Sequence, residues 1–190
     1  MNYQNFFNNY KDSIYKLLNE VDSSLIEQSV NLIRKKNIVF IVGNGGSASI
    51  ASHVSVDFLK VAKIKSSTFN NSNLITCYAN DFGHENWVKE AIKSNCSMDK
   101  DLMILISSSG KSNNIINAAK YCKENNMKLI TLSGFDKDNE LKKYGDINFF
   151  VNSNNYNYVE MTHHIIMVSM VDILSKIQLP LSITLFLNCK

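Results

Sequence analysis

The sequence predicts an α/β fold in which a parallel sheet lies between two layers of helices, as a three-layer sandwich. Apolar runs that suit buried strands occur at residues 38–42, 74–78, 103–107, 128–133 and 147–151. Helical patterns alternate with these runs, at about 48–61, 85–95, 112–125, 137–143 and 159–177. Because the chain has one proline (Pro180) and no shift in composition that would mark a linker, we expect residues 1–190 to form a single domain.

Two helical patterns precede the first strand, within residues 1–35. Apolar residues recur at spacings of three and four from Tyr10 to Val21, and a similar stripe runs from Leu25 to Ile33. A break between them is expected at Asp22-Ser23-Ser24. Such leading helices either contact a partner chain in an oligomer or pack on their own domain. The apolar stretch from Leu179 to Leu187 allows the same two interpretations.

The first strand, Ile38 to Val42, runs into the glycine-rich loop Gly43-Asn44-Gly45-Gly46-Ser47. Glycines let the backbone turn tightly and approach a ligand without interference from a Cβ atom. The small residues from Ala48 onward predict a helix start, whose free N–H groups and positive end favour an anion. Strand, loop and helix in this order predict a phosphate site; the alternative is an ordinary strand-to-helix turn.

A second segment repeats this order. The strand Leu102 to Ile106 leads into Ser107-Ser108-Ser109-Gly110-Lys111-Ser112 and then into a helix. Because ligands bind at the carboxyl ends of parallel strands, the two loops can converge on one anion. Leu105 stands where a Walker loop needs a glycine, and no dinucleotide-binding glycine pattern occurs. This hydroxyl-rich cradle fits a sugar phosphate better than a nucleotide, so no nucleotide cofactor is expected.

Composition and charge are those of an ordinary globular protein, with 45% hydrophobic and 19% charged residues. A formal charge of +3 with scattered lysines does not indicate nucleic-acid binding. No stretch is long enough to span a membrane, and the polar N-terminus is unlike a signal peptide. We therefore expect a cytoplasmic protein without a nucleic-acid or membrane partner. The cysteines lack C-x-x-C spacing, which favours buried, reduced thiols at Cys77, Cys96, Cys122 and Cys189.

Three motifs keep the order and spacing of one protein family: Val42 to Ala48, Asn80-Asp81-Phe82-Gly83-His84-Glu85, and Ser107 to Ser112. With them the chain, up to about residue 177, resembles the sugar isomerase (SIS) domain family and, within it, the phosphoheptose isomerases. The resemblance implies a five-stranded parallel sheet flanked by helices, and a homotetramer with active sites at subunit contacts. It also implies isomerisation of sedoheptulose 7-phosphate to D-glycero-D-manno-heptose 7-phosphate, a step toward the heptose of lipopolysaccharide or capsule.

The resemblance also implies which residues bind the substrate. Those expected to hold the sugar or contact its hydroxyls are Asn44, Gly45, Gly46, Ser47, Asn80 and Asp81. Those expected to bind the phosphate are Ser107, Ser108, Ser109 and Ser112.

Such isomerases carry a His and a Glu four residues apart on the first helix of the domain, which here are His53 and Asp57. Residues four apart share a helix face, so the two side chains can converge on one metal or one substrate. Aspartate keeps the charge of glutamate but retracts the carboxylate by one methylene. This matters because proton transfer needs heavy atoms within about 3 Å of each other.

The last helix departs further from the family pattern. The family has a Gln and, eight residues on, a His, both associated with zinc; Glu160 and Val168 stand at these positions, and valine can neither bind a metal nor carry a proton. Because carboxylate and imidazole both bind zinc, a rearranged site could form from His53, Asp57, Glu160 and His164. The alternative is no metal, with His163 at a helix cap or interface and His164 as a hydrogen-bonding partner of the substrate.

Aldose–ketose isomerisation needs a base that removes a proton from the carbon beside the carbonyl, and a group that stabilises the charge on oxygen. Asp57 is the first candidate for the base, and Glu160 and His164 are the next candidates. A metal at His53, or a protonated His53 or His164, would polarise the carbonyl. Glu85 is a further acid, whose alternative role is to complete a helix cap.

A different class of function is also compatible with the sequence. Loss of the last-helix His fits a non-catalytic SIS protein, either a phosphosugar-binding module or a tetrameric regulator that associates with the replication initiator protein. Against this interpretation, His53, Asp57 and the segment 160–164 keep titratable groups that a plain scaffold does not need. A third possibility is an isomerase of another ketose phosphate.

Overall fold

The computed structural model of this protein describes residues 1–178, so the stretch Leu179 to Leu187 and Cys189 lie outside the described residues. The strands are β1 (Val39–Gly43), β2 (Ser66–Ser67), β3 (Leu102–Ser107), β4 (Lys128–Gly134) and β5 (Ile147–Val151). The helices are α1 (Tyr3–Asn19), α2 (Ser23–Ile33), α3 (Gly46–Lys60), α4 (Ser72–Phe82), α5 (Trp87–Asn95), α6 (Asn113–Glu124) and α7 (Tyr156–Gln178), with the short 3-10 helix η1 (Glu140–Lys143).

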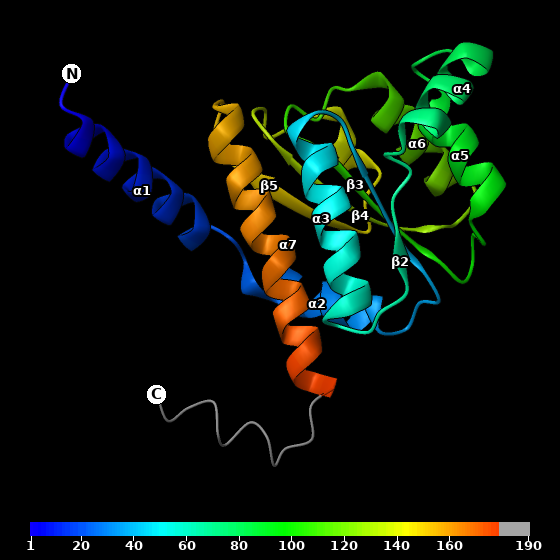
Figure 1. Cartoon of the computed structure of the whole chain (residues 1–190), viewed down its shortest axis with the longest axis horizontal. Coiled ribbons are helices and arrows are strands. Elements are labelled where there is room, and N and C mark those ends of the chain that lie inside the picture. Colours follow the sequence, from blue (N-terminus) through cyan, green and yellow to red (C-terminus); the bar gives the residue numbers. More distant parts are fainter. Residues whose placement is uncertain (179–190) are drawn as a thin grey trace.

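The sheet lies between two helical layers (Figure 1), and its neighbouring strands are all parallel in the order β2-β1-β3-β4-β5. Successive side chains of a strand point to opposite faces. Ile41 and Ile104 therefore pack against α2, α3 and α7, whereas Val42 and Leu105 pack against α5 and α6. Both faces of the strands are apolar because both are buried. The predicted α/β sandwich with a five-stranded parallel sheet is confirmed.

One predicted strand is wrong. Residues 74–78 belong to α4, whose start is capped by Asn71: its side-chain oxygen accepts hydrogen bonds from the backbone N–H groups of Asn73 and Leu74. The strand expected there is instead β2, which pairs two serines with Val39 and Phe40 of β1. Two polar residues carry no strand pattern, and this is why the sequence pointed to the apolar run that follows.

The leading helices break at residues 20–22, which overlaps the predicted break at Asp22 and begins two residues before it. Asp22 caps α2 by accepting a 2.9 Å hydrogen bond from the N–H of Ser24. Helix α1 extends away from the sheet (Figure 1), and the one residue that it buries is Leu17. Its exposed aromatic side chains are Tyr3, Phe6, Phe7 and Tyr15. The apolar stripe of α1 is therefore largely uncovered within one chain.

The described cysteines are all free thiols. Cys122 is buried, and burial raises the pKa of its thiol to about 12. Cys96 is half-buried, but Cys77 is exposed on α4, so the expectation of a buried thiol is wrong at Cys77. Among residues 1–178, no helix is both long and apolar enough to cross a membrane.

Candidate functional site

A small pocket lies at the carboxyl ends of β1 and β3, where the two predicted loops meet. Its volume is about 100 Å³. Ligand pockets commonly measure roughly 300–1,000 Å³, so this pocket takes one end of a ligand rather than a whole sugar. The residues that line it are Asn44, Ser47, Ile106, Ser107, Ser108, Ser109, Ser112, Tyr156 and Glu160. Six of the predicted substrate-binding residues therefore lie around one cavity.

The glycine-rich loop requires its glycines. Gly45 has a φ of +53°, which side chains rarely adopt. At Gly46, a Cβ atom would meet the carboxylate at the end of the flexible Glu160 side chain, which would have to move, so the loop and α7 lie close together here. Helix α3 begins at Gly46, and its positive end is therefore placed at the pocket.

The serine-rich loop closes the other side of the pocket. Ser112 caps α6 by position, and its hydroxyl lies 3.1 Å from the hydroxyl of Ser107. The hydroxyl of Ser108 lies 3.5 Å from the Glu160 carboxylate. Two helix starts and several hydroxyl groups suit an anion. Within the described residues no lysine or arginine lines the pocket, so its one charged side chain is that of Glu160.

The two loops are joined by a pair of asparagines. The side-chain amides of Asn44 and Asn114 donate to each other's oxygen at 2.9 Å in both directions, and Asn114 is 2% exposed. Sequence reasoning assigned no role to Asn114, which stands just after the serine-rich loop. On the far side of β1, Asn70 donates a 2.8 Å hydrogen bond to the carbonyl of Gly43. Asparagines distant in sequence thus hold the pocket loops in place.

A second cluster of polar side chains lies farther along α3 and α7. The carboxylate of Asp57 is 3.1 Å from Nε2 of His53, and Nδ1 of His53 is 2.8 Å from Nε2 of His164. The side chain of His53 is 52% exposed. Partial burial lowers the pKa of His164, and His53 lowers it further, while Asp57 acts in the opposite direction. The three residues form a hydrogen-bonded chain from one helix to the other.

The predicted zinc ligands do not converge as a group in this chain. Glu160 lines the pocket and meets Ser108, whereas both ring nitrogens of His53 already face side-chain partners. Among residues 1–178, no three His, Cys, Asp or Glu side chains gather in a way that could hold a metal ion. Val168 packs against the core beneath the helices. The described donors of one chain therefore do not form a zinc site by themselves, and zinc binding stays a prediction.

His163 is a core residue rather than a helix cap. It is fully buried, and its Nε2 lies 3.1 Å from the carbonyl oxygen of Ser133, so this nitrogen carries the proton that is donated. Burial lowers the pKa of His163 to about 4. Its Nδ1 has no hydrogen-bond partner among residues 1–178. Neighbouring histidines on α7 therefore differ in character: His163 is neutral and structural, while His164 reaches the surface cluster.

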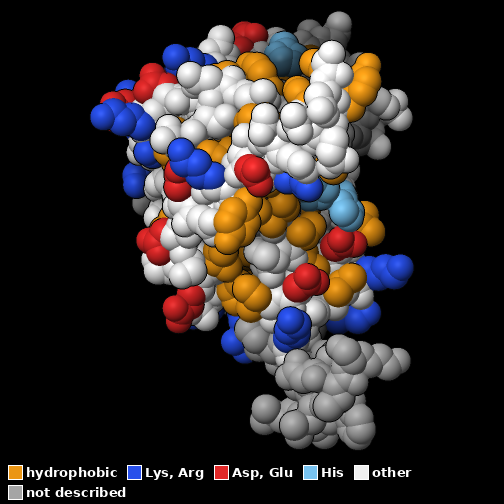
Figure 2. Space-filling model, turned by 90° about the vertical axis from the view of Figure 1, so that its left-hand side faces the viewer, with side chains coloured by type: hydrophobic (Ala, Val, Ile, Leu, Met, Phe, Trp, Pro, Cys, Tyr) orange, Lys and Arg blue, Asp and Glu red, His pale blue; other side chains and the backbone are white. Residues whose placement is uncertain are grey.

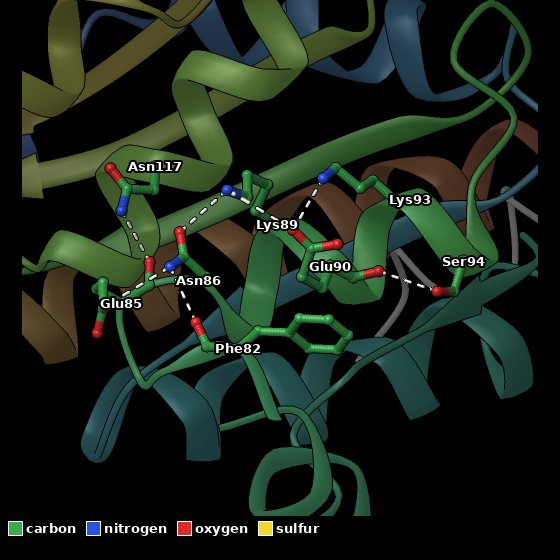
Figure 3. Close-up of polar contacts among 8 residues, drawn as sticks. All are labelled: Phe82, Glu85, Asn86, Lys89, Glu90, Lys93, Ser94 and Asn117. Atoms are coloured by element: carbon green, nitrogen blue, oxygen red, sulfur yellow. Dashed lines mark hydrogen bonds and ion pairs between the residues drawn. The ribbon is translucent and has the colours of Figure 1, made fainter. Parts of the chain in front are cut away.

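The motif around Asn80 and Asp81 lies outside the pocket. These two side chains are exposed at the end of α4 and pair with each other at 2.9 Å. The turn that follows is held in place by neighbouring amides (Figure 3): Asn86 donates to the carbonyl of Phe82, and Asn117 of α6 donates to the carbonyl of Glu85. Within one chain these predicted sugar contacts are not brought to the other site residues.

Comparison with known proteins gives one consistent result. The SIS domain family matches residues 2–134 of the chain. The phosphoheptose isomerase of Aliarcobacter butzleri is 30% identical over 165 residues, which cover 81% of this chain and 85% of that protein. The phosphoheptose isomerase of Aneurinibacillus thermoaerophilus is 31% identical over 136 residues, covering 66% of this chain and 67% of that protein.

Among solved structures, a phosphoheptose isomerase from Francisella tularensis superposes with a TM-score of 0.80. The match covers 93% of this chain and 100% of that one, at 22% sequence identity. At this level of identity, the likeness shows that the fold is shared.

Proposed function

Because this chain belongs to the SIS domain family, and to its phosphoheptose isomerase branch, we propose that it is an aldose–ketose isomerase of a phosphorylated sugar. The substrate that we propose is sedoheptulose 7-phosphate, converted in the cytoplasm to D-glycero-D-manno-heptose 7-phosphate for the heptose of lipopolysaccharide or capsule. The observation that carries the proposal is the pocket itself. Loops from β1 and β3 line one cavity with hydroxyl groups and helix starts.

The pocket and the second cluster lie on the same two helices. Gly46 and His53 are seven residues apart on α3, and Glu160 and His164 are four residues apart on α7. In this proposal, the phosphate lies at the serines and the carbonyl end of the sugar extends along the helices toward His53 and Asp57.

In the proposed reaction, Asp57 takes the proton from C1 or C2, depending on direction, and returns it to the neighbouring carbon. Among the described residues, the ion-pair partner of its carboxylate is His53, at 3.1 Å, and this contact orients the carboxylate. To donate a hydrogen bond to the oxygen that gains charge in the enediolate, His53 exchanges one of its two present partners, Asp57 or His164, for the substrate. The phosphate anchors the remote end and orients the reacting carbons.

We also propose that the chain acts as a homotetramer with active sites at subunit contacts. Hydrophobic side chains gather in a band on the face shown in Figure 2, with charged side chains around them. The exposed apolar residues of α3 and α7 include Val56, Leu59, Met161, Ile165 and Ile173. Covering such a band and the aromatic side chains of α1 favours association. The same contact would bring a partner's groups to the exposed His53.

The test is a coupled isomerase assay with sedoheptulose 7-phosphate and shorter ketose phosphates, with and without added zinc, on protein whose metal content and mass in solution are measured. We expect turnover of the seven-carbon substrate by a tetramer. A tetramer that binds the sugar phosphate and shows no turnover under either condition would overturn the isomerase proposal in favour of a binding module.

A further inference from the structure

Phe135 adopts a backbone conformation that bulky residues rarely take. It follows β4 directly, and its φ is +64°, in the left-handed region. Its N–H donates a 3.0 Å hydrogen bond to the carbonyl of Ser153, which fixes the turn. A left-handed conformation at a residue with a large side chain persists only where the surroundings determine it. The surroundings here are aromatic and apolar.

The ring of Phe135 is held against Tyr156. The two ring centroids are 4.7 Å apart at an angle of 64°, an edge-on arrangement that aromatic pairs prefer. Phe135 also packs at the edge of a cluster made by Leu17, Val151 and Val159. The left-handed turn thus directs the Phe135 ring to the start of α7, where Tyr156 stands.

Tyr156 forms part of the wall of the phosphate pocket. It is the first residue of α7, and Asn155 caps this helix by accepting from the N–H groups of Asn157 and Tyr158. Although Tyr156 lines the pocket, 57% of its surface is exposed. A side chain in this position faces the part of a ligand that leaves the cavity.

We propose that the Phe135–Tyr156 ring pair forms an aromatic wall that contacts the carbon chain next to the phosphate, and so distinguishes a sugar phosphate from free phosphate. In this proposal, Tyr156 touches the ligand and Phe135 is a positioning residue. The ligand class comes from the proposed function, but the inference concerns binding and does not depend on turnover.

The pocket needs such a second contact. Its small volume admits the phosphate group alone, and no lysine or arginine among the described residues lines it. The C–H groups of a sugar chain pack favourably on an aromatic ring, and the tyrosine hydroxyl can bond a sugar hydroxyl. Because the wall stands beside the anion site, its contribution adds to that of the hydroxyl groups only for a ligand that carries carbon atoms.

The test compares dissociation constants for inorganic phosphate and for sedoheptulose 7-phosphate in the full chain, by titration calorimetry. For Tyr156→Ala we expect the sugar phosphate to bind about fivefold more weakly, the effect of one aromatic contact, and inorganic phosphate to stay within about twofold. Ser109→Ala is the matched control, because it touches the anion and should weaken both ligands alike. Tyr156→Phe separates the ring from its hydroxyl.

Phe135 is tested with two variants. Phe135→Asn keeps a residue that tolerates the left-handed conformation and removes the ring, so it should reproduce the selective loss seen for Tyr156→Ala. Phe135→Tyr keeps the ring and should restore discrimination. A purely structural role would instead lower the melting temperature and weaken both ligands together.

Three results would overturn the inference. These are equal losses for both ligands in Tyr156→Ala, no loss for either ligand, or no binding of sedoheptulose 7-phosphate and of fructose 6-phosphate by the unmodified protein. Failure of the proposed function has a separate signature. A protein that shows the selective loss in Tyr156→Ala but no isomerase activity would retain the aromatic wall and lose the assigned reaction.

Discussion

The pocket and the His53–Asp57–His164 cluster lie on the same two helices but are built in different ways. The pocket is enclosed by backbone turns and held by asparagines, of which Asn114 is buried. The cluster consists of side chains on the outer faces of α3 and α7, with His53 half exposed. The pocket is therefore enclosed by residues of one chain, whereas the His53–Asp57–His164 cluster is open on the outer face of the helices.

This difference gives the largest predicted effect. Asp57→Asn removes the proposed base at the reacting end, so we expect turnover to fall by about 10²–10⁴-fold. Affinity for the sugar phosphate should change by less than about twofold, because the pocket is untouched. The measurement is steady-state kinetics together with calorimetric titration. Asp172→Asn, an exposed acid on α7, is the matched control and should behave as the unmodified protein. Full activity in Asp57→Asn would remove Asp57 as the base.

The two adjacent histidines of α7, His163 and His164, lead to a prediction about how stability depends on pH. His163 has a folded-state pKa of about 4, against 6.5 for an ordinary histidine. Between pH 6.5 and about pH 4, the unfolded chain therefore binds a proton at His163 and the folded chain does not. The free energy of unfolding consequently falls as the pH drops from 6.5 toward 4, and His163 accounts for about 3 kcal/mol of this fall.

The measurement is urea unfolding at pH 7 and at pH 4.5. His163→Gln should lose part of this pH dependence, since glutamine does not titrate, whereas His164→Gln should retain it. The same slope in all three proteins would contradict a buried neutral His163.

A smaller effect is expected at the amide pair that joins the loops. Asn114→Ala leaves the amide of Asn44 without its partner, so we expect the free energy of unfolding to fall by about 1–3 kcal/mol and phosphate to bind more weakly. The preceding exposed residue supplies the control: Asn113→Ala should leave both quantities unchanged. If phosphate affinity survives while stability falls, the pair serves the fold and not the pocket.

The smallest effect is expected at a single hydroxyl of the pocket. Ser109→Ala should weaken binding of the sugar phosphate by roughly 1–2 kcal/mol, the contribution of one charge-assisted hydrogen bond, with less change in kcat. Ser94→Ala, on the exposed side of α5, is the control. A fall in kcat larger than the change in affinity would mean that the two ends of the site are not separate.

Local patterns made the pocket loops predictable. Glycines, serines and apolar strand runs are each contiguous in the chain, and the parallel sheet brings their ends together without further information. The partners of the loops were not predictable in this way. Asn70 and Asn114 meet the first loop across 27 and 70 residues, and no local pattern encodes such a meeting.

The cluster and the short strand show two other limits of the sequence. Shared helix faces predicted the pairing of His53 with Asp57, and the resemblance placed His164 near them. Which ring nitrogen faces which neighbour depends on rotamers, and these give a hydrogen-bonded chain in the described residues. Strand β2 was not predicted because its two serines show no hydrophobic periodicity. The left-handed backbone conformation of Phe135 was not predicted because a phenylalanine side chain does not indicate one.

The mutual bonding of Asn44 and Asn114 has a consequence for how fast a ligand is captured. Each amide satisfies the other before any anion arrives, so neither loop has to search for its partner once the ligand is present. We therefore expect that capture needs no rearrangement of these two loops relative to each other, and that its rate follows diffusion to the rim of the cavity.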